Sequence, residues 1–291
     1  MNICEDFSMN YPKDEIELRN KNGEIINEMK NSFTKLVTSD YEQALVEVIN
    51  PDGFYPYYTH QKIKILFIGK EALGLYGNDY IEAIFKGIQS NDPRGHREWN
   101  KTHTTNRYSQ VMTNNSDPFH KKMLYIAYGL NNNNCSYSDM PWASDIGENL
   151  FGRSEGIDSL QGETGISYAF INYSKFDNPS EESYSADVNR MQTYTNMVKQ
   201  SGVNWFAKQI SLLNPDLIID MNINREYINN LGAKPVDWIP FDDDLAICHL
   251  PIEDKEYLLF ETWHFSRPGM GFEEKFYSPI TEAWEKFGKK N

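Results

Sequence analysis

The sequence has few cysteines and no long apolar run. Cys4, Cys135 and Cys248 are odd in number and widely spaced, which excludes a disulfide framework and a CxxC metal pair. No stretch is long and apolar enough to cross a bilayer, and the acidic, polar segment Met1–Asp14 is unlike a secretory signal. These absences predict a cytoplasmic protein that does not enter the membrane.

The sequence also lacks a Pro-, Gly- or Ser-rich linker that would divide it. Of its 291 residues 40% are hydrophobic, which is enough for a sizeable core. We therefore predict a single α/β domain over residues 1–291, with an N-terminal helical extension (about 1–60) and a polar insert (about 91–160).

Basic residues are scarce relative to acidic ones. The 28 Lys and Arg face 42 Asp and Glu, which gives a net charge of −14. Proteins that bind duplex DNA mainly through its phosphates usually carry a basic face, so this balance argues against non-specific duplex binding. Local patches remain conceivable where Lys62, Lys64 and Lys70 cluster and where Lys121 adjoins Lys122, unless these lysines are simply scattered over a solvated surface.

Several motifs of cofactor and metal sites are missing. No Gly-Lys-Ser/Thr ends a phosphate loop, and neither GxGxxG nor GxSxG occurs. The spacing of His96, His103 and His120 in the polar insert matches no zinc motif. His249 lies beside Cys248 in an apolar run, which predicts a core position. We expect no metal and no cofactor.

What the sequence does contain is an alternation of apolar strands and helical segments. The predicted strands are Ile63–Ile68, Ile166–Tyr173, Leu217–Asp220, Leu245–Leu250 and Tyr257–Trp263. The predicted helices are Ile16–Val37, Tyr41–Ile49, Tyr80–Ile88, Lys122–Gly129, Ser185–Leu213 and Ile280–Phe287. A turn is predicted at Asn50–Gly53. The order of these elements favours a parallel-rich three-layer α/β/α sandwich, whose ligands bind beyond the carboxyl ends of the strands.

The first strand exit is the loop Gly69–Gly77. Its glycines permit tight turns and close approach of a ligand, and Glu71 could orient or deprotonate a water. Alternatively, Glu71 caps the following helix or pairs with Lys70. The candidate substrate-binding residues of this loop are Gly69, Lys70, Gly74 and Tyr76.

The second exit carries Asn172, whose side-chain donor and acceptor suit the amide-like edge of a nucleobase. Tyr173 or Phe176 could stack on a base. The alternative is that Asn172 caps a turn and the two aromatic rings fill the core.

The last exit carries His264, Ser266 and Arg267. His264 could donate to the anion that develops on a leaving base, and Arg267 could hold a phosphate through two hydrogen bonds. A structural role for the histidine is the alternative.

In this order the exits resemble the motifs of the uracil-DNA glycosylase superfamily, over about Lys62–Gly269. Ile65–Gly74 is similar to the motif written GQDPY or GEAPG, Phe170–Phe176 to TNLVPF, Asn214–Asp220 to KPKVIVxLG, and His264–Pro268 to HPSP. The similarity is strongest to uncharacterised bacterial members whose first motif reads like GQETNGW.

This resemblance implies a mainly parallel four-stranded central sheet between helices. It also implies hydrolysis of the N-glycosidic bond of a damaged base, in DNA or in a nucleotide, with the base flipped into a pocket. Glu71 would position the water, Asn172 would recognise the base and His264 would stabilise the departing base anion. The implied partner is a nucleobase-containing substrate, with single-stranded or damaged DNA as one form. No cysteine set matches the iron–sulfur cluster of some branches.

Two other functions remain open from the sequence. One is a non-catalytic module that keeps this fold and binds a nucleotide or a protein. The other is an unrelated flavodoxin- or Rossmann-like enzyme that holds a phosphate in the Gly69–Gly77 loop, although no dinucleotide motif is present.

Overall fold

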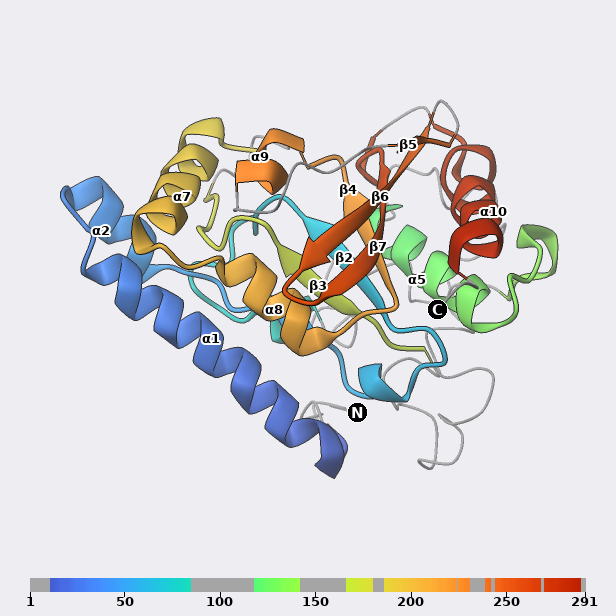
Figure 1. Ribbon diagram of the computed structural model, residues 1–291, viewed down its shortest axis with the longest axis horizontal. Helices are drawn as coiled ribbons and strands as arrows, with labels where there is room; N and C mark the ends of the chain where they lie inside the picture. The colour runs from blue at the N-terminus through green and yellow to red at the C-terminus, as the bar shows by residue number, and fades with distance from the viewer. Residues whose placement is uncertain are drawn as a thin grey trace, which may run out of the picture.

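The computed structural model describes residues 11–84, 118–141, 166–179, 186–223, 225–230, 239–241, 244–267 and 270–288. The described residues form a seven-stranded mixed sheet in the order β1-β3-β2-β4-β7-β6-β5 (Figure 1). The strands are β1 (Gly53–Phe54), β2 (Ile65–Gly69), β3 (Ala169–Asn172), β4 (Leu217–Met221), β5 (Ile239–Pro240), β6 (Leu245–Ile252) and β7 (Lys255–Thr262). Strands β3, β2, β4 and β7 run parallel, whereas β1, β6 and β5 pair antiparallel at the two edges.

The apolar runs predicted as strands supply the parallel centre of this sheet. Every residue of β2 and of β4 is buried, as expected for strands that are covered on both faces. The α/β class is therefore confirmed, but the expectation of four strands is corrected. Antiparallel strands widen the sheet, and two of them, β1 and β5, are too short to leave a recognisable pattern.

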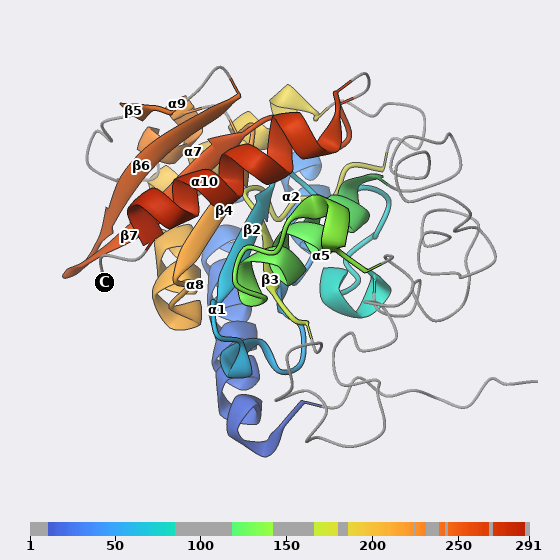
Figure 2. The ribbon, with the colours of Figure 1, turned by 90° about the vertical axis from the view of Figure 1, so that its right-hand side faces the viewer.

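Helices cover both faces of the sheet. Alternate residues of β2 enter two cores: Phe67 packs on the side of α5 (Pro118–Asn131) and α10 (Ser278–Phe287), and Leu66 packs on the opposite side. That opposite side is covered by α1 (Ile16–Thr34), α2 (Asp40–Glu47), α7 (Val188–Ser201) and α8 (Trp205–Leu213). Figure 2 shows α5 and α10 in front of the strands and α1 behind them. Shorter helices are η1 (Lys13–Glu15), η2 (Tyr58–His60), η5 (Tyr137–Asp139), α9 (Arg225–Asn230) and the π-helical η7 (Glu273–Tyr277).

The N-terminal segment is built into this architecture. Helices α1 and α2 cover one face, with Ile26, Met29 and Phe33 buried at helical spacing, and β1 pairs with β3. From the polar insert, α5 covers the other face, while His96 and His103 lie outside the described residues. The helix expected over Tyr80–Ile88 is described only for residues 80–84. In the described part of the chain no helix is both long and apolar enough to span a membrane.

The single helix predicted over Ser185–Leu213 is two helices, α7 and α8. Gly202 ends α7 in the left-handed conformation with φ of 66°, which glycine adopts without a steric penalty. The side chain of Asn204 then accepts from the N–H of Ala207 and caps α8. Both stop and start signals are present in the sequence, and the continuous helical periodicity masked them.

Some side-chain locations also differ from expectation. His249 is exposed, although its neighbours Cys248 and Leu250 in β6 are buried. Lys122 is buried within α5 rather than part of a surface lysine pair. Lys62 and Lys64 precede β2, at the opposite end of the strand from Lys70. The turn predicted at residues 50–53 is also wrong, since this segment leads directly into β1.

Candidate functional site

The carboxyl ends of four parallel strands meet at one edge of the sheet. Because β2 lies between β3 and β4, the chain passes from β2 to β3 on one side and then crosses to β4 on the other. In open α/β sheets, ligands bind outside the carboxyl ends at such a switch point. The three strand exits selected from the sequence therefore lie along one edge.

Gly69 and Asn172 lie side by side at this edge, paired at the ends of β2 and β3. A Cβ atom at Gly69 would lie 2.6 Å from Oδ1 of Asn172 and 2.7 Å from Cζ of Phe170. Real Cβ atoms do not approach other atoms so closely. Glycine at this position therefore leaves room for the Asn172 side chain.

A buried ion pair holds the backbone of Asn172. Its N–H donates to Oδ2 of Asp52 (2.7 Å), and its carbonyl accepts from Nζ of Lys175 (2.6 Å). The Lys175 ammonium also donates to both Asp52 oxygens, at 2.9 and 2.8 Å. Among the described residues, none forms a hydrogen bond with the side-chain amide of Asn172. The strand end thus holds one buried amide, with a donor and an acceptor, on a fixed backbone.

A row of rings connects this amide with His264. The ring of Tyr80 stacks on Phe170, with centroids 4.4 Å apart, and its hydroxyl lies 3.2 Å from Nε2 of His120. Phe119 contacts Phe170 edge-on at 5.9 Å and stacks on His264 at 5.3 Å. Asn172 and His264 therefore border the same aromatic group. Sequence reasoning missed Tyr80 and Phe119, because their contacts join segments far apart in the chain.

The turn that follows β7 fixes the orientation of His264. The backbone N–H of Ser266 donates to Nδ1 of His264 (3.2 Å), and the N–H of Arg267 donates to its carbonyl (2.9 Å). The buried Nζ of Lys122 donates to the carbonyl of Phe265 (2.5 Å), and burial lowers the pKa of this lysine to about 8. Because Nδ1 accepts, the neutral imidazole carries its proton on Nε2.

Glu71 is directed at the beginning of α7. Its Oε1 accepts from the backbone N–H of Asp187 (2.7 Å) and from Nδ2 of Asn178 (2.8 Å). Its Oε2 is buried and has no hydrogen-bond partner among the described residues. Burial is the main cause that raises the pKa of this carboxyl. Glu71 is thus held by Asp187 and Asn178, Asn172 by Asp52 and Lys175, and His264 by the turn after β7. These bonds give the three residues no partner in common.

The loop Gly69–Gly77 does not offer a free cradle of N–H groups. The N–H groups of Gly74, Leu75 and Gly77 donate to Asn178, Asp177 and Asn50 at 2.8, 2.8 and 2.7 Å. Gly74 has a φ of 67°, so this turn requires its glycine for conformational reasons. These bonds argue against the flavodoxin- or Rossmann-like alternative, in which the loop amides hold a phosphate.

The stacking role expected of Tyr173 and Phe176 is not supported by their positions. Both rings are fully buried on the α7 side, where each contacts Tyr194. The hydroxyl of Tyr173 also lies 2.8 Å from Oγ1 of Thr195 in α7. The alternative reading is correct for these two residues, because their rings fill the core.

The other candidates lie at the surface of the same edge. Tyr76 is 56% exposed, and Ser266 and Arg267 are exposed in the turn after β7. The guanidinium of Arg267 lies 3.8 Å above the Trp263 ring. Lys70 contributes to the wall of a pocket next to these residues.

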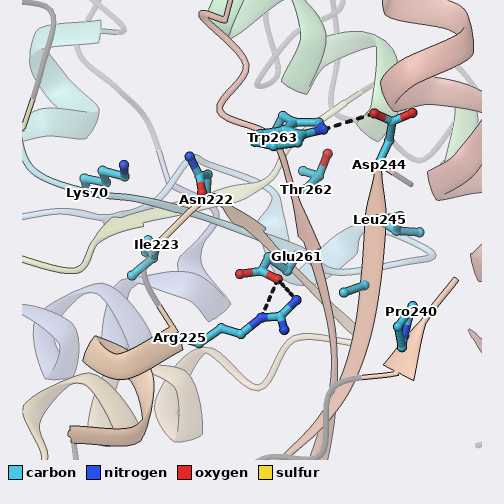
Figure 3. Close-up of a pocket in the computed structure, with 11 residues that line it drawn as sticks. Lys70, Asn222, Ile223, Arg225, Pro240, Asp244, Leu245, Glu261, Thr262 and Trp263 are labelled. Atoms are coloured by element: carbon cyan, nitrogen blue, oxygen red, sulfur yellow. Dashed lines mark hydrogen bonds and ion pairs between the residues drawn. The ribbon is translucent and has the colours of Figure 1, made fainter. Parts of the chain in front are cut away.

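That pocket has a volume of about 560 Å³ and opens beside the ends of β2, β4 and β7 (Figure 3). Its lining residues are Lys70, Asn222, Ile223, Arg225, Pro240, Asp244, Leu245, Ala246, Glu261, Thr262 and Trp263. Arg225 forms an ion pair with Glu261 through Nε (2.8 Å) and Nη2. Asp244 accepts from Nε1 of Trp263 (3.0 Å) and from Nζ of Lys275 (2.6 Å).

The exit of β4, which supplies Asn222 and Arg225, was missed from the sequence. The strand Leu217–Asp220 was predicted, and the rule that sites follow strand ends applies to its exit as well. Here Oδ1 of Asp220 accepts from the N–H of Ile223 (2.9 Å), and complete burial is the main cause that raises the pKa of this carboxyl well above its usual range.

The chain was compared with protein-family models and with curated proteins. No family model matches the chain, and no curated protein is significantly similar to it in sequence. Among the described residues, no group of three or more His, Cys, Asp or Glu side chains could hold a metal ion.

Proposed function

We propose that the chain binds a nucleobase at the edge formed by Gly69, Asn172 and His264 and hydrolyses its N-glycosidic bond. The observation that carries this proposal is the Asn172 amide, which lacks a protein partner among the described residues and is held by the buried Asp52–Lys175 pair. The resemblance to the uracil-DNA glycosylase superfamily gives the same residues these roles. The strand order and the helices on both faces are in keeping with the three-layer fold of that family.

In this proposal Asn172 and His264 act on different parts of the base. The Asn172 amide hydrogen-bonds the edge of the base, which carries both donors and acceptors. When the bond to the sugar breaks, its electron pair stays on the base, and the Nε2–H of His264 stabilises the resulting anion. A water then adds to the sugar carbon, and the proton that it loses neutralises the base anion, directly or through the solvent. Only Oε2 of Glu71 is left to position that water, because Oε1 is engaged at α7.

A base-release assay tests this function. Uracil- and hypoxanthine-containing oligonucleotides and the free nucleotides are incubated with the protein, and the released base is quantified. We expect release by the wild-type chain, and a loss of about 100-fold or more in His264→Ala, which removes the donor to the anion. His249→Ala, which removes an exposed histidine of β6, is the matched control and should keep full activity. Absence of release from every such substrate contradicts the enzymatic proposal.

A non-catalytic binding module is the second candidate, and the position of Glu71 favours it. A carboxylate that already holds the start of α7 is poorly placed to activate a water. This alternative predicts base or nucleotide binding without turnover, and binding that survives Glu71→Gln. Hydrolysis that falls in Glu71→Gln while binding persists would exclude it.

A further inference from the structure

The pocket beside β2, β4 and β7 is not used by the base site. Gly69 and Lys70 are consecutive, but Gly69 faces Asn172, whereas Lys70 lines the pocket. Trp263 and His264 are likewise consecutive and contribute to the pocket and to the base site respectively. The volume of about 560 Å³ is within the range of small-molecule sites. The two sites are therefore adjacent across the carboxyl end of one strand.

The charges in this pocket leave one lysine available to a ligand. Arg225 is engaged with Glu261 (Figure 3). Asp244 is engaged with Lys275. In contrast, the Lys70 ammonium forms no hydrogen bond or ion pair with the described residues. An exposed lysine without a partner is common, but this one lines a concave site.

Two further polar groups in the pocket have no hydrogen-bond partner in the part of the chain that the structure describes. The Thr262 side chain is nearly fully buried, and its hydroxyl oxygen has no hydrogen-bond partner among the described residues. Asn222, which lines the same pocket as Lys70 and Thr262 (Figure 3), has a φ of 57°, and its side chain makes no hydrogen bond with the described residues. A cation, a hydroxyl and an amide are groups that donate hydrogen bonds to an anion.

We propose that this pocket binds the phosphate of a nucleoside monophosphate, which lies across the end of β2 with its base at Asn172 and its phosphate at Lys70. The inference rests on the proposed function and narrows its substrate to a single, small nucleotide. Burial raises the pKa of Asp220, the acid close to Lys70, which weakens its tendency to carry a charge opposite to that of the lysine.

A polynucleotide fits this pocket less well than one phosphate. The net charge of −14 opposes a polyanion more strongly than it opposes a single phosphate. Glu261 and Asp244 border the pocket. Both carboxylates are already paired, so one phosphate meets little repulsion from them.

Calorimetric titration of the full chain tests this inference. The ligands are 2′-deoxyuridine, inosine, their 5′-monophosphates, inorganic phosphate and an eight-nucleotide single strand that contains deoxyuridine. We expect a monophosphate to bind about tenfold or more tightly than its nucleoside, the effect of hydrogen bonds to a charged group. Lys70→Ala should abolish this preference, Lys70→Arg should retain it, and Lys64→Ala, at the other end of β2, should leave it unchanged.

The outcomes separate this inference from the proposed function. Equal affinity for nucleoside and monophosphate overturns the inference and leaves the base site intact. Phosphate binding that depends on Lys70, with no nucleoside binding, supports the pocket and contradicts the base site. An oligonucleotide that binds more tightly than the monophosphate, in a manner dependent on Lys70, overturns the restriction to a small nucleotide.

Discussion

At the scale of single residues, the candidate site depends on a missing side chain. The space beside Gly69 is filled by Oδ1 of Asn172 and the ring of Phe170, and both belong to the well-packed end of β3. A methyl group there would displace the amide that we assign to base recognition. Sequence reasoning could find Gly69 as part of a turn, but only the strand register shows which side chain it accommodates.

We expect Gly69→Ala to destabilise the fold by about 1–3 kcal/mol, because the new methyl group overpacks this site. Gly23→Ala is the control: Gly23 lies within α1, its added Cβ would meet no atom within 4 Å, and alanine favours a helix by about 0.5–1 kcal/mol. Urea denaturation measures both changes. If the two substitutions change the free energy of unfolding similarly, the close approach of Gly69 to Asn172 does not affect the stability of the fold.

Asp79 gives a prediction about pH. Its Oδ1 accepts from the N–H of Glu82 (2.9 Å), and burial raises the pKa of this carboxyl to about 6. The folded chain therefore favours the protonated form. The resulting stability is present at low pH and is lost as the pH rises through 6. In Asp79→Asn, which can still cap the helix, the difference in unfolding temperature between pH 5 and pH 7 should be smaller than in the wild type. If the unfolding temperature changes equally between pH 5 and pH 7 in the wild type and in Asp79→Asn, the raised pKa of Asp79 is refuted.

At the scale of elements, a buried polar network joins the exit of β3 to two helices. Asp52 accepts from Lys175, and its carbonyl accepts from Nδ2 of Asn22 in α1 (2.6 Å). Nε2 of Gln209 in α8 also donates to Oδ1 of Asp52 (3.1 Å). The base site is thus supported from the opposite face of the sheet, by groups that are distant in sequence from Asn172.

Lys175→Met should destabilise the fold by about 3–5 kcal/mol, because it leaves the Asp52 carboxylate buried and unpaired. The double variant Asp52→Asn/Lys175→Met should cost less than the sum of the two single changes, since neither charge then remains. Urea denaturation of the four proteins of this cycle measures the coupling. Additive effects would mean that the pair does not act as a unit.

Elements with long apolar patterns were predictable, and those defined by contacts were not. The runs that became β2, β3, β4 and β7 were recognisable because both faces of these strands are buried. β1 has only two residues, so its pairing with β3 leaves no pattern. The break at Gly202 was visible in principle, because a glycine followed two residues later by Asn204 combines a stop signal with a cap.

At the scale of the whole molecule, strand order brings the exits to one edge but does not decide which side chains meet. The sequence analysis placed its candidates at three strand ends, and the pocket is lined in addition by residues that follow β4, an exit that was not considered. Asn172 and His264 border one aromatic group, whereas Glu71 turns to α7, and Tyr173 and Phe176 fill the core. Glu71, Tyr173 and Phe176 follow the ends of β2 and β3, where the alternation of a strand no longer sets the direction of a side chain.

The most direct test of the base site is a crystal structure of the chain soaked with free uracil or hypoxanthine. We predict density for the base within hydrogen-bonding distance of both the Asn172 side-chain amide and the His264 imidazole, and its loss in Asn172→Ala crystals. Density for the base at a place remote from both side chains, or none at saturating concentration, would contradict this account.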